Sequence, residues 1–113
     1  NMDTRKHRRI ARLAIQAVPY EICGVIKEGK VIQCRNMAAN PEEAFLIDAQ
    51  SYLKHRPDTI FHSHPKGNKG FSEHDLVVAA NMELTSYVYC VEADRLEKWS
   101  PDTGLEIFEQ VLS

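Results

Sequence analysis

The stretch FHSHPKGNKGFSEHD, residues 61–75, decides how this chain is interpreted. It begins as a β-rich segment and continues through a polar loop that contains two glycines. Ser72 then opens a segment in which Leu76, Val77 and Ala80 recur at helical spacing. The stretch is therefore predicted to be a strand, a loop and a capped helix. It also holds three of the five histidines, so it is a candidate metal site as well.

The rest of the chain predicts further strands and helices around this stretch. Apolar residues at helical spacing indicate a helix over 4–18, with Ile10, Leu13, Ala14, Ala17 and Val18 on one stripe. EICGVIKEGKVIQCRN predicts two strands joined at Glu28-Gly29. Then follow a short strand at 44–48, a short helix at 49–56, strand-like segments at 58–64, 86–93 and 95–100, and a turn before LEIFEQVL. This order predicts an α/β (α+β) sandwich, a mixed sheet flanked by helices.

Size and composition favour one globular domain over residues 1–113. The chain is 43% apolar and 27% charged, an ordinary globular mixture. A net charge of −2 gives no general attraction to nucleic acid or anionic membrane, so we expect neither as a partner. No apolar run approaches the ~20 residues that a membrane helix needs. The basic residues early in the first helix allow a nucleic-acid arm, but such runs are usually a solvated helix face.

The three cysteines indicate the redox compartment of the protein. Cys23, Cys34 and Cys90 form no CxxC pair, and an odd number argues against a disulfide framework. We therefore expect reduced thiols in a cytoplasmic protein, with Cys23 and Cys90 buried as packing residues. Asn1 precedes Met2 and is expected to be a tag remnant.

His62, His64 and Asp75 are the candidate metal ligands. Side chains two apart on a strand point to the same face, about 6.6 Å apart, and two imidazoles there can converge on one ion. The pair alone is weak evidence for a metal, since most such pairs are surface or satisfied core histidines. Asp75 stands three residues after Ser72, a capping-box pattern that needs no metal. Cap and ligand are compatible roles, and a His-His-Asp set with an open fourth position is the coordination of a catalytic zinc.

Glu21 is the candidate base. A zinc hydrolase needs a group that takes the proton of the activated water. Glu21 lies between Pro19 and the strand ICGVI, on neither a helix face nor a long loop. A solvated glutamate at a strand edge is the alternative. A zinc site of the cytidine-deaminase type is excluded, because H-x-E and P-C-x-x-C are both missing.

Together these residues resemble the JAMM (MPN-plus) metalloprotease motif, in which a glutamate precedes H-S-H-P and a serine and aspartate follow at H-x(7)-S-x-x-D. The resemblance covers nearly the whole chain and implies the JAMM-type sandwich, with a curved mixed sheet. It implies that one Zn²⁺ is bound by His62, His64 and Asp75, with water as the fourth ligand. It also implies that Glu21 is the general base and that Ser72 donates a hydrogen bond to the oxyanion.

CRNMAANPEEAFLID and SYVYCVEADRLEKWSPDTG resemble the bacterial and phage branch of this family. Two groups there are similar: the N-terminal domain of the lambda tail assembly protein K type, normally followed by an NlpC-type peptidase domain, and the small peptidase that trims ubiquitin-like sulfur carriers. The implied activity is hydrolysis of a peptide or isopeptide bond in a peptide or ubiquitin-like protein, in the cytoplasm of a bacterium or phage-infected host. Phage tail proteins or an NlpC-type domain are the implied partners. The alternative is an inactive metal-binding scaffold or a structural component of the phage tail, although scaffold members usually lose a ligand.

Overall fold

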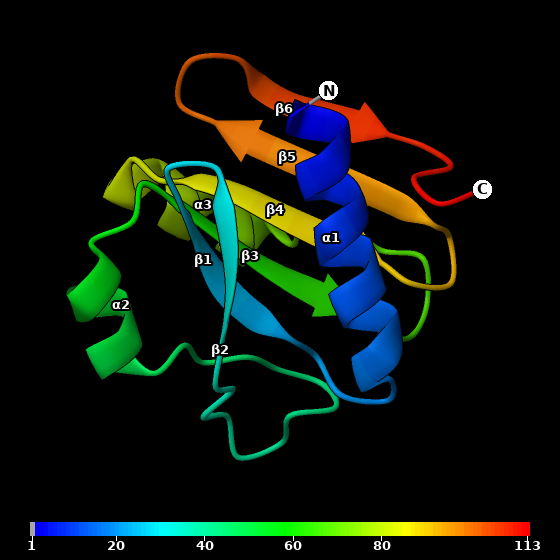
Figure 1. Cartoon of the computed structure of the whole chain (residues 1–113), viewed down its shortest axis with the longest axis horizontal. Helices are drawn as coiled ribbons and strands as arrows, with labels where there is room; N and C mark the ends of the chain where they lie inside the picture. Colours follow the sequence, from blue (N-terminus) through cyan, green and yellow to red (C-terminus); the bar gives the residue numbers. More distant parts are fainter. Residues whose placement is uncertain (1) are drawn as a thin grey trace.

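A computed structural model describes residues 2–113, so that Asn1, the expected tag remnant, lies outside the described residues. Over this range the chain forms one six-stranded sheet in the order β2-β1-β3-β4-β5-β6. The helix α1 lies against one face of the sheet, and α3 lies against the other (Figure 1). The elements are α1 (Met2–Ala17), β1 (Cys23–Lys27), β2 (Lys30–Cys34), α2 (Ala49–His55), β3 (Thr59–His64), α3 (Glu73–Met82), β4 (Thr85–Cys90), β5 (Arg95–Ser100) and β6 (Gly104–Phe108).

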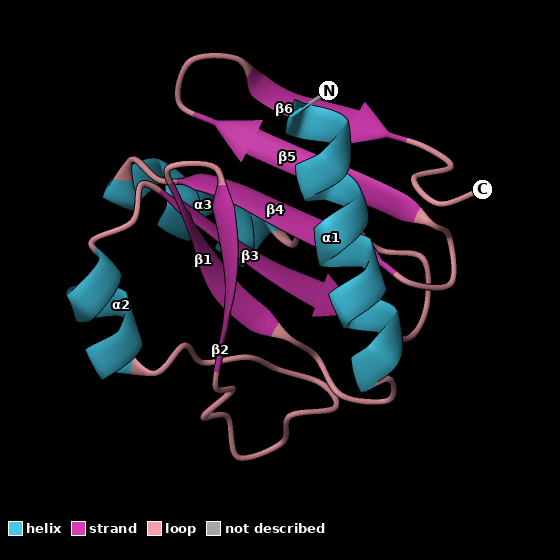
Figure 2. Cartoon of the chain, viewed as in Figure 1, coloured by secondary structure: helices cyan, strands magenta, loops and turns pink. Residues whose placement is uncertain are grey.

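The sheet is mixed, as predicted. The strands β3 and β4 pair in parallel, and each other pair is antiparallel. A parallel pair needs a crossover connection, and α3 provides it on the face opposite α1 (Figure 2). The loop that leaves the end of β3 therefore leads directly into the first turn of α3. The predicted α+β sandwich, a mixed sheet flanked by helices, is confirmed.

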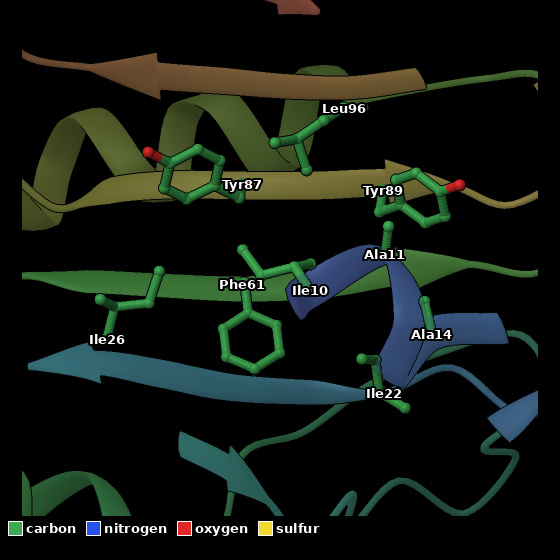
Figure 3. Packing of buried hydrophobic residues seen from close by; sticks show 9 residues of the cluster. All are labelled: Ile10, Ala11, Ala14, Ile22, Ile26, Phe61, Tyr87, Tyr89 and Leu96. Carbon is green, nitrogen blue, oxygen red and sulfur yellow. The ribbon is translucent and has the colours of Figure 1, made fainter. Parts of the chain in front are cut away.

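The core lies between α1 and the sheet. Three small or branched residues of α1 pack against side chains of β1, β3, β4 and β5 (Figure 3). The cluster comprises Ile10, Ala11, Ala14, Ile22, Ile26, Phe61, Tyr87, Tyr89 and Leu96. Because strand residues alternate between faces, the side chains between them point toward α3. The sheet face toward α1 therefore carries the core, and the face toward α3 carries the candidate site.

Several predicted boundaries differ from the structure. The first helix ends at Ala17, and Val18 is exposed in the turn before Pro19 instead of lying on the buried stripe. Residues 44–48 form no strand; only an isolated bridge joins Asn36 to Ile47. A ladder does not form there because the Asn36 side chain bonds the backbone of that segment, accepting the Leu46 N–H at 3.0 Å. Ser72 is the cap of α3, and Glu83 ends it in the left-handed conformation.

Gly24 is expected to be the glycine least tolerant of substitution in the sheet. A Cβ atom there would lie 2.3 Å from the Ile32 carbonyl oxygen and 2.4 Å from the Phe61 ring. The aromatic ring occupies the space over β1, and backbone oxygen cannot retreat without breaking the ladder. Gly24→Ala is therefore expected to destabilise the fold by about 2–3 kcal/mol. Thermal unfolding of the metal-free protein measures this, and an unchanged midpoint would contradict the packing described.

Candidate metal centre

The pairing of β1 with β3 brings Glu21 beside the two histidines. Cys23 is opposite His62 in the antiparallel register. The pairing extends beyond β1, because Ser63 N–H donates to the Ile22 carbonyl at 3.1 Å and Ile22 N–H donates to Ser63 Oγ at 2.9 Å. One step further along this register, Glu21 comes opposite His64. The serine between the histidines thus joins the strand of the ligands to the strand of the base.

The start of α3 brings the third candidate ligand. Ser72 is the N-cap, and its Oγ accepts the Asp75 N–H at 3.0 Å while an Asp75 carboxylate oxygen accepts the Ser72 N–H at 3.1 Å. The predicted capping box is therefore present. Oδ2 of the same Asp75 carboxylate lies 3.7 Å from His62 Nε2. Each of His62, His64 and Asp75 offers a ligand atom, and these atoms lie within 4.8 Å of one another.

His62 fits a metal ligand better than a structural histidine. Its side chain is 3% exposed, and both ring nitrogens are buried without a hydrogen-bond partner. Phe45 stacks on the ring at 4.2 Å between centroids, with an interplanar angle of 17°. Burial lowers the pKa of His62 to about 3, an effect that Asp75 opposes and His64 adds to. The imidazole is therefore neutral at neutral pH, and leaving its two buried nitrogens unpartnered costs free energy that a metal ion bound to one of them would recover.

His64 has the hydrogen bond that orients a metal-binding histidine. Its Nδ1 lies 2.9 Å from the Lys69 carbonyl oxygen. A carbonyl can only accept, so Nδ1 carries the proton and donates it. The lone pair is then on Nε2, which is the nitrogen left for a metal.

Glu21 is buried, not solvated, so the edge-glutamate alternative is wrong. The residue is 7% exposed. Its N–H donates to the Pro41 carbonyl at 2.7 Å, and its carbonyl accepts from Asn36 Nδ2 at 3.0 Å. Burial raises the pKa of Glu21 to about 7; His64 lowers it and Asp75 raises it. A carboxyl group with this pKa can both take and return a proton near neutral pH.

A cavity of about 560 Å³ opens onto these groups. Its polar end is formed by the residues named above, and its other walls include Ile60, Val78 and Leu84. A second, more apolar cavity of about 410 Å³ adjoins it. Both cavities share four lining residues: Phe45, Leu46, Ile60 and Leu84. The site can therefore admit a polar group at the histidines and an apolar segment beside it.

The structure also places residues that the sequence did not single out. Asn36 uses both ends of its amide, donating to the Glu21 and Ala44 carbonyls and accepting from Ala38 and Leu46 N–H, each at 3.0 Å. It thereby holds the loop that carries Phe45. Cys23 and Cys90 are buried, as expected.

His74 is exposed, and it also lines the cavity. His7 is buried at 8% exposure beside Tyr87 and Phe108, away from the candidate ligands on the α1 side of the sheet.

The mixed α+β sandwich with a His-His-Asp group beside a buried glutamate is compatible with a metal-dependent hydrolase. A family model described as prokaryotic homologs of the JAB domain matches residues 3–102. The chain belongs to that family, which confirms the predicted JAB/MPN membership.

No curated protein matches the chain. The solution structure of the protein DSY2949 from Desulfitobacterium hafniense is similar, with a TM-score of 0.65 and 21% identity, over 93% of this chain and 86% of that chain. Likeness at this identity supports the fold. Among residues 2–113, no helix is both long and apolar enough to cross a membrane.

Proposed function

We propose that the protein is a zinc-dependent peptidase or isopeptidase. The observation that carries this proposal is the buried, unpartnered His62 ring beside Asp75 and the free Nε2 of His64, with the buried Glu21 opposite. A ligand set of two imidazoles and one carboxylate suits zinc, and it leaves a fourth position for water. One Zn²⁺ held by His62, His64 and Asp75 would polarise a substrate carbonyl and lower the pKa of its bound water.

Glu21 performs the proton transfers in this proposal. Its raised pKa makes the carboxylate basic enough to accept a proton from the attacking water at neutral pH. The same carboxyl can then return the proton to the leaving amine. Because Glu21 is buried, the proton on its carboxyl is not lost to bulk solvent before it reaches the amine.

Ser72 supplies the hydrogen bond to the developing oxyanion. Its Oγ already accepts the Asp75 N–H, so the hydroxyl proton remains free to donate into the cavity. The capping box also fixes the hydroxyl relative to Asp75, and a fixed donor stabilises charge without reorganising.

The cavity supports a peptide segment as substrate. Its apolar walls and the adjoining apolar cavity can cover side chains that flank a scissile bond. A peptide or ubiquitin-like protein in a bacterial or phage-infected cytoplasm is the substrate we propose. The roles proposed from the resemblance are phage tail assembly, with tail proteins or an NlpC-type domain as partners, and sulfur-carrier trimming. Genomic neighbours distinguish them, since tail genes and sulfur-carrier genes support different roles.

Hydrolysis by the zinc-loaded protein tests the proposal. A panel of peptides and ubiquitin-like fusions is incubated with the protein, and new amino termini are detected by mass spectrometry. We expect cleavage that a chelator abolishes and added zinc restores. Full zinc occupancy without cleavage of any panel member would favour the inactive metal-binding scaffold.

Ser72→Ala is expected to reduce kcat while zinc stays bound. Loss of an oxyanion donor lowers kcat by about 10²-fold or more. Loss of the cap costs about 1 kcal/mol of stability, which leaves the protein folded. Ser72→Thr keeps a hydroxyl and a cap and is the matched control. Equal kcat values for the alanine and threonine variants would remove Ser72 from the mechanism.

A further inference from the structure

The loop between β3 and α3 is held by side chains of β5 that lie outside the motif. Residues 65–71 connect His64 to the first turn of α3, and the Lys69 carbonyl in this loop accepts the His64 Nδ1–H. The position of that carbonyl decides which nitrogen of His64 is protonated. The groups that fix the loop backbone next to Lys69 therefore influence a candidate metal ligand without touching it.

Register explains why β5 can reach the loop. His62 and His64 of β3 are in register with Val88 and Cys90 of β4. Glu97 is in turn opposite Val88, and Arg95 is opposite Cys90. In-register neighbours point to the same face, so Arg95 and Glu97 project on the same side of the sheet as the two histidines.

Glu97 and Arg95 form a largely buried ion pair that contacts the loop backbone. Arg95 Nε donates to Glu97 Oε2 at 3.1 Å, and the two side chains are 16% and 11% exposed. Glu97 Oε1 accepts the Phe71 N–H at 3.2 Å, and the Arg95 guanidinium donates to the Asn68 carbonyl. The ion pair thus forms hydrogen bonds to the loop backbone on both sides of Lys69.

Two more contacts tighten this arrangement. The Cys90 thiol donates to the Lys69 carbonyl at 3.2 Å, so that carbonyl accepts from two groups. Gly70 lies against the Glu97 carboxylate, where an added Cβ would come 2.0 Å from its atoms. A side chain at that position cannot coexist with the carboxylate in its present place.

We infer that Glu97, paired with Arg95, is a positioning residue that fixes the Lys69 carbonyl and thereby holds His64 with Nε2 free for metal. The inference rests on the proposed metal centre. Glu97 touches neither the candidate ligands nor the reacting atoms. It acts through the loop backbone, as the partners behind metal-binding histidines commonly do.

Zinc affinity and the His64 tautomer test this inference in the full chain. Glu97→Ala is expected to weaken Zn²⁺ binding by about 10- to 100-fold, measured by competition with a chromophoric chelator. Long-range ¹H–¹⁵N spectra of the metal-free protein at pH 8 are expected to show His64 protonated on Nδ1, and a mixture of both tautomers in Glu97→Ala. Glu92→Ala is the matched control, because its carboxylate accepts the Gly67 N–H at 2.9 Å at the exposed tip of the same loop. This control should leave affinity and tautomer unchanged.

A double-mutant cycle separates positioning from general damage. Gly70→Ala alone should weaken zinc binding, because the new methyl group displaces the Glu97 carboxylate. Added to Glu97→Ala, it should have little further effect, since the obstacle is gone. Should Glu97→Ala not fold, Glu97→Gln, which keeps an acceptor for Phe71 N–H, is measured in its place and should show a smaller loss.

Two results would overturn the inference: wild-type affinity with an unchanged His64 tautomer in the Glu97 variants, or additive effects in the cycle. Neither readout requires hydrolysis. A protein that binds zinc in this manner but cleaves nothing would refute the proposed peptidase activity and leave the role of Glu97 standing.

Discussion

Glu21→Gln is expected to abolish hydrolysis while zinc stays bound. An amide cannot accept the proton of the attacking water, and general-base catalysis contributes about 10²- to 10⁴-fold. Gln has nearly the same shape, and Glu21 is not among the three candidate ligands, so the metal site should survive. Zinc content by elemental analysis and kcat on a cleaved substrate measure the two effects. Activity equal to that of the wild type would exclude Glu21 as the base.

The same substitution is expected to stabilise the metal-free protein at alkaline pH. The folded-state pKa of Glu21 is raised to about 7 from 4.5, so the fold prefers the protonated carboxyl. That preference contributes fully below pH 4.5 and is lost as pH rises through 7. At pH 8, Glu21→Gln should therefore gain up to about 3 kcal/mol, and at pH 5 only about 1 kcal/mol.

Thermal unfolding with a chelator present measures this gain. Variant and wild type are compared at each pH, because neutral His62 makes its own contribution. The pKa of His62 is lowered to about 3, so that contribution is present above pH 6.5 and is lost as pH falls toward 3. The exposed Glu43, which lines the same cavity, provides the control variant Glu43→Gln. An equal gain at both pH values would show that the charge of Glu21 is not its cause.

Asp75→Ala is expected to lose most of its zinc. Two imidazoles leave the ion short of a protein ligand and of the negative charge that the carboxylate supplies. The variant also loses half of the capping box, which costs about 1 kcal/mol. Metal analysis after dialysis against a weak chelator should give far less than one zinc per chain.

Asp75→Asn distinguishes the two roles of this residue. Asparagine can still accept the Ser72 N–H, so the helix start should keep its stability, whereas the neutral amide is a poor zinc ligand. Zinc loss in both variants with a normal melting temperature for Asp75→Asn supports Asp75 as a ligand. Stoichiometric zinc in Asp75→Ala would show that the ligand assignment is wrong.

The parts of the site that are local in the chain were predictable. His62 and His64 share one strand, and Asp75 follows a short loop, so period, loop and cap suffice to bring them together. The hairpin at Glu28-Gly29 was predictable for the same reason: both residues adopt positive φ, which a tight turn demands. Glu21 was harder. Its burial depends on the pairing of β1 with β3 and on the loop that follows β2, neither of which composition reveals.

The supporting residues could not be predicted because their contacts depend on register between distant strands. RLEKWS places the charged residues Arg95 and Glu97 on one face of a strand, a pattern that ordinarily indicates that this face is solvated. The structure instead covers that face with the loop before α3, so that Glu97 is buried at 8% exposure. The role of Asn36 was equally hard to predict. It lies in a polar, proline-containing loop, where asparagine is common, so the sequence gives no sign of its four hydrogen bonds.

The way Asn36 holds its loop has a consequence for how this protein can diversify. The Asn36 amide bonds this segment through backbone groups only, and backbone groups do not change when side chains do. Glu43, an exposed residue of this loop that lines the cavity, can therefore vary without moving Phe45 off His62 or releasing the Glu21 carbonyl. Substrate preference and proton transfer are separable in this arrangement, so new specificities can evolve in the loop while the chemistry beneath it stays the same.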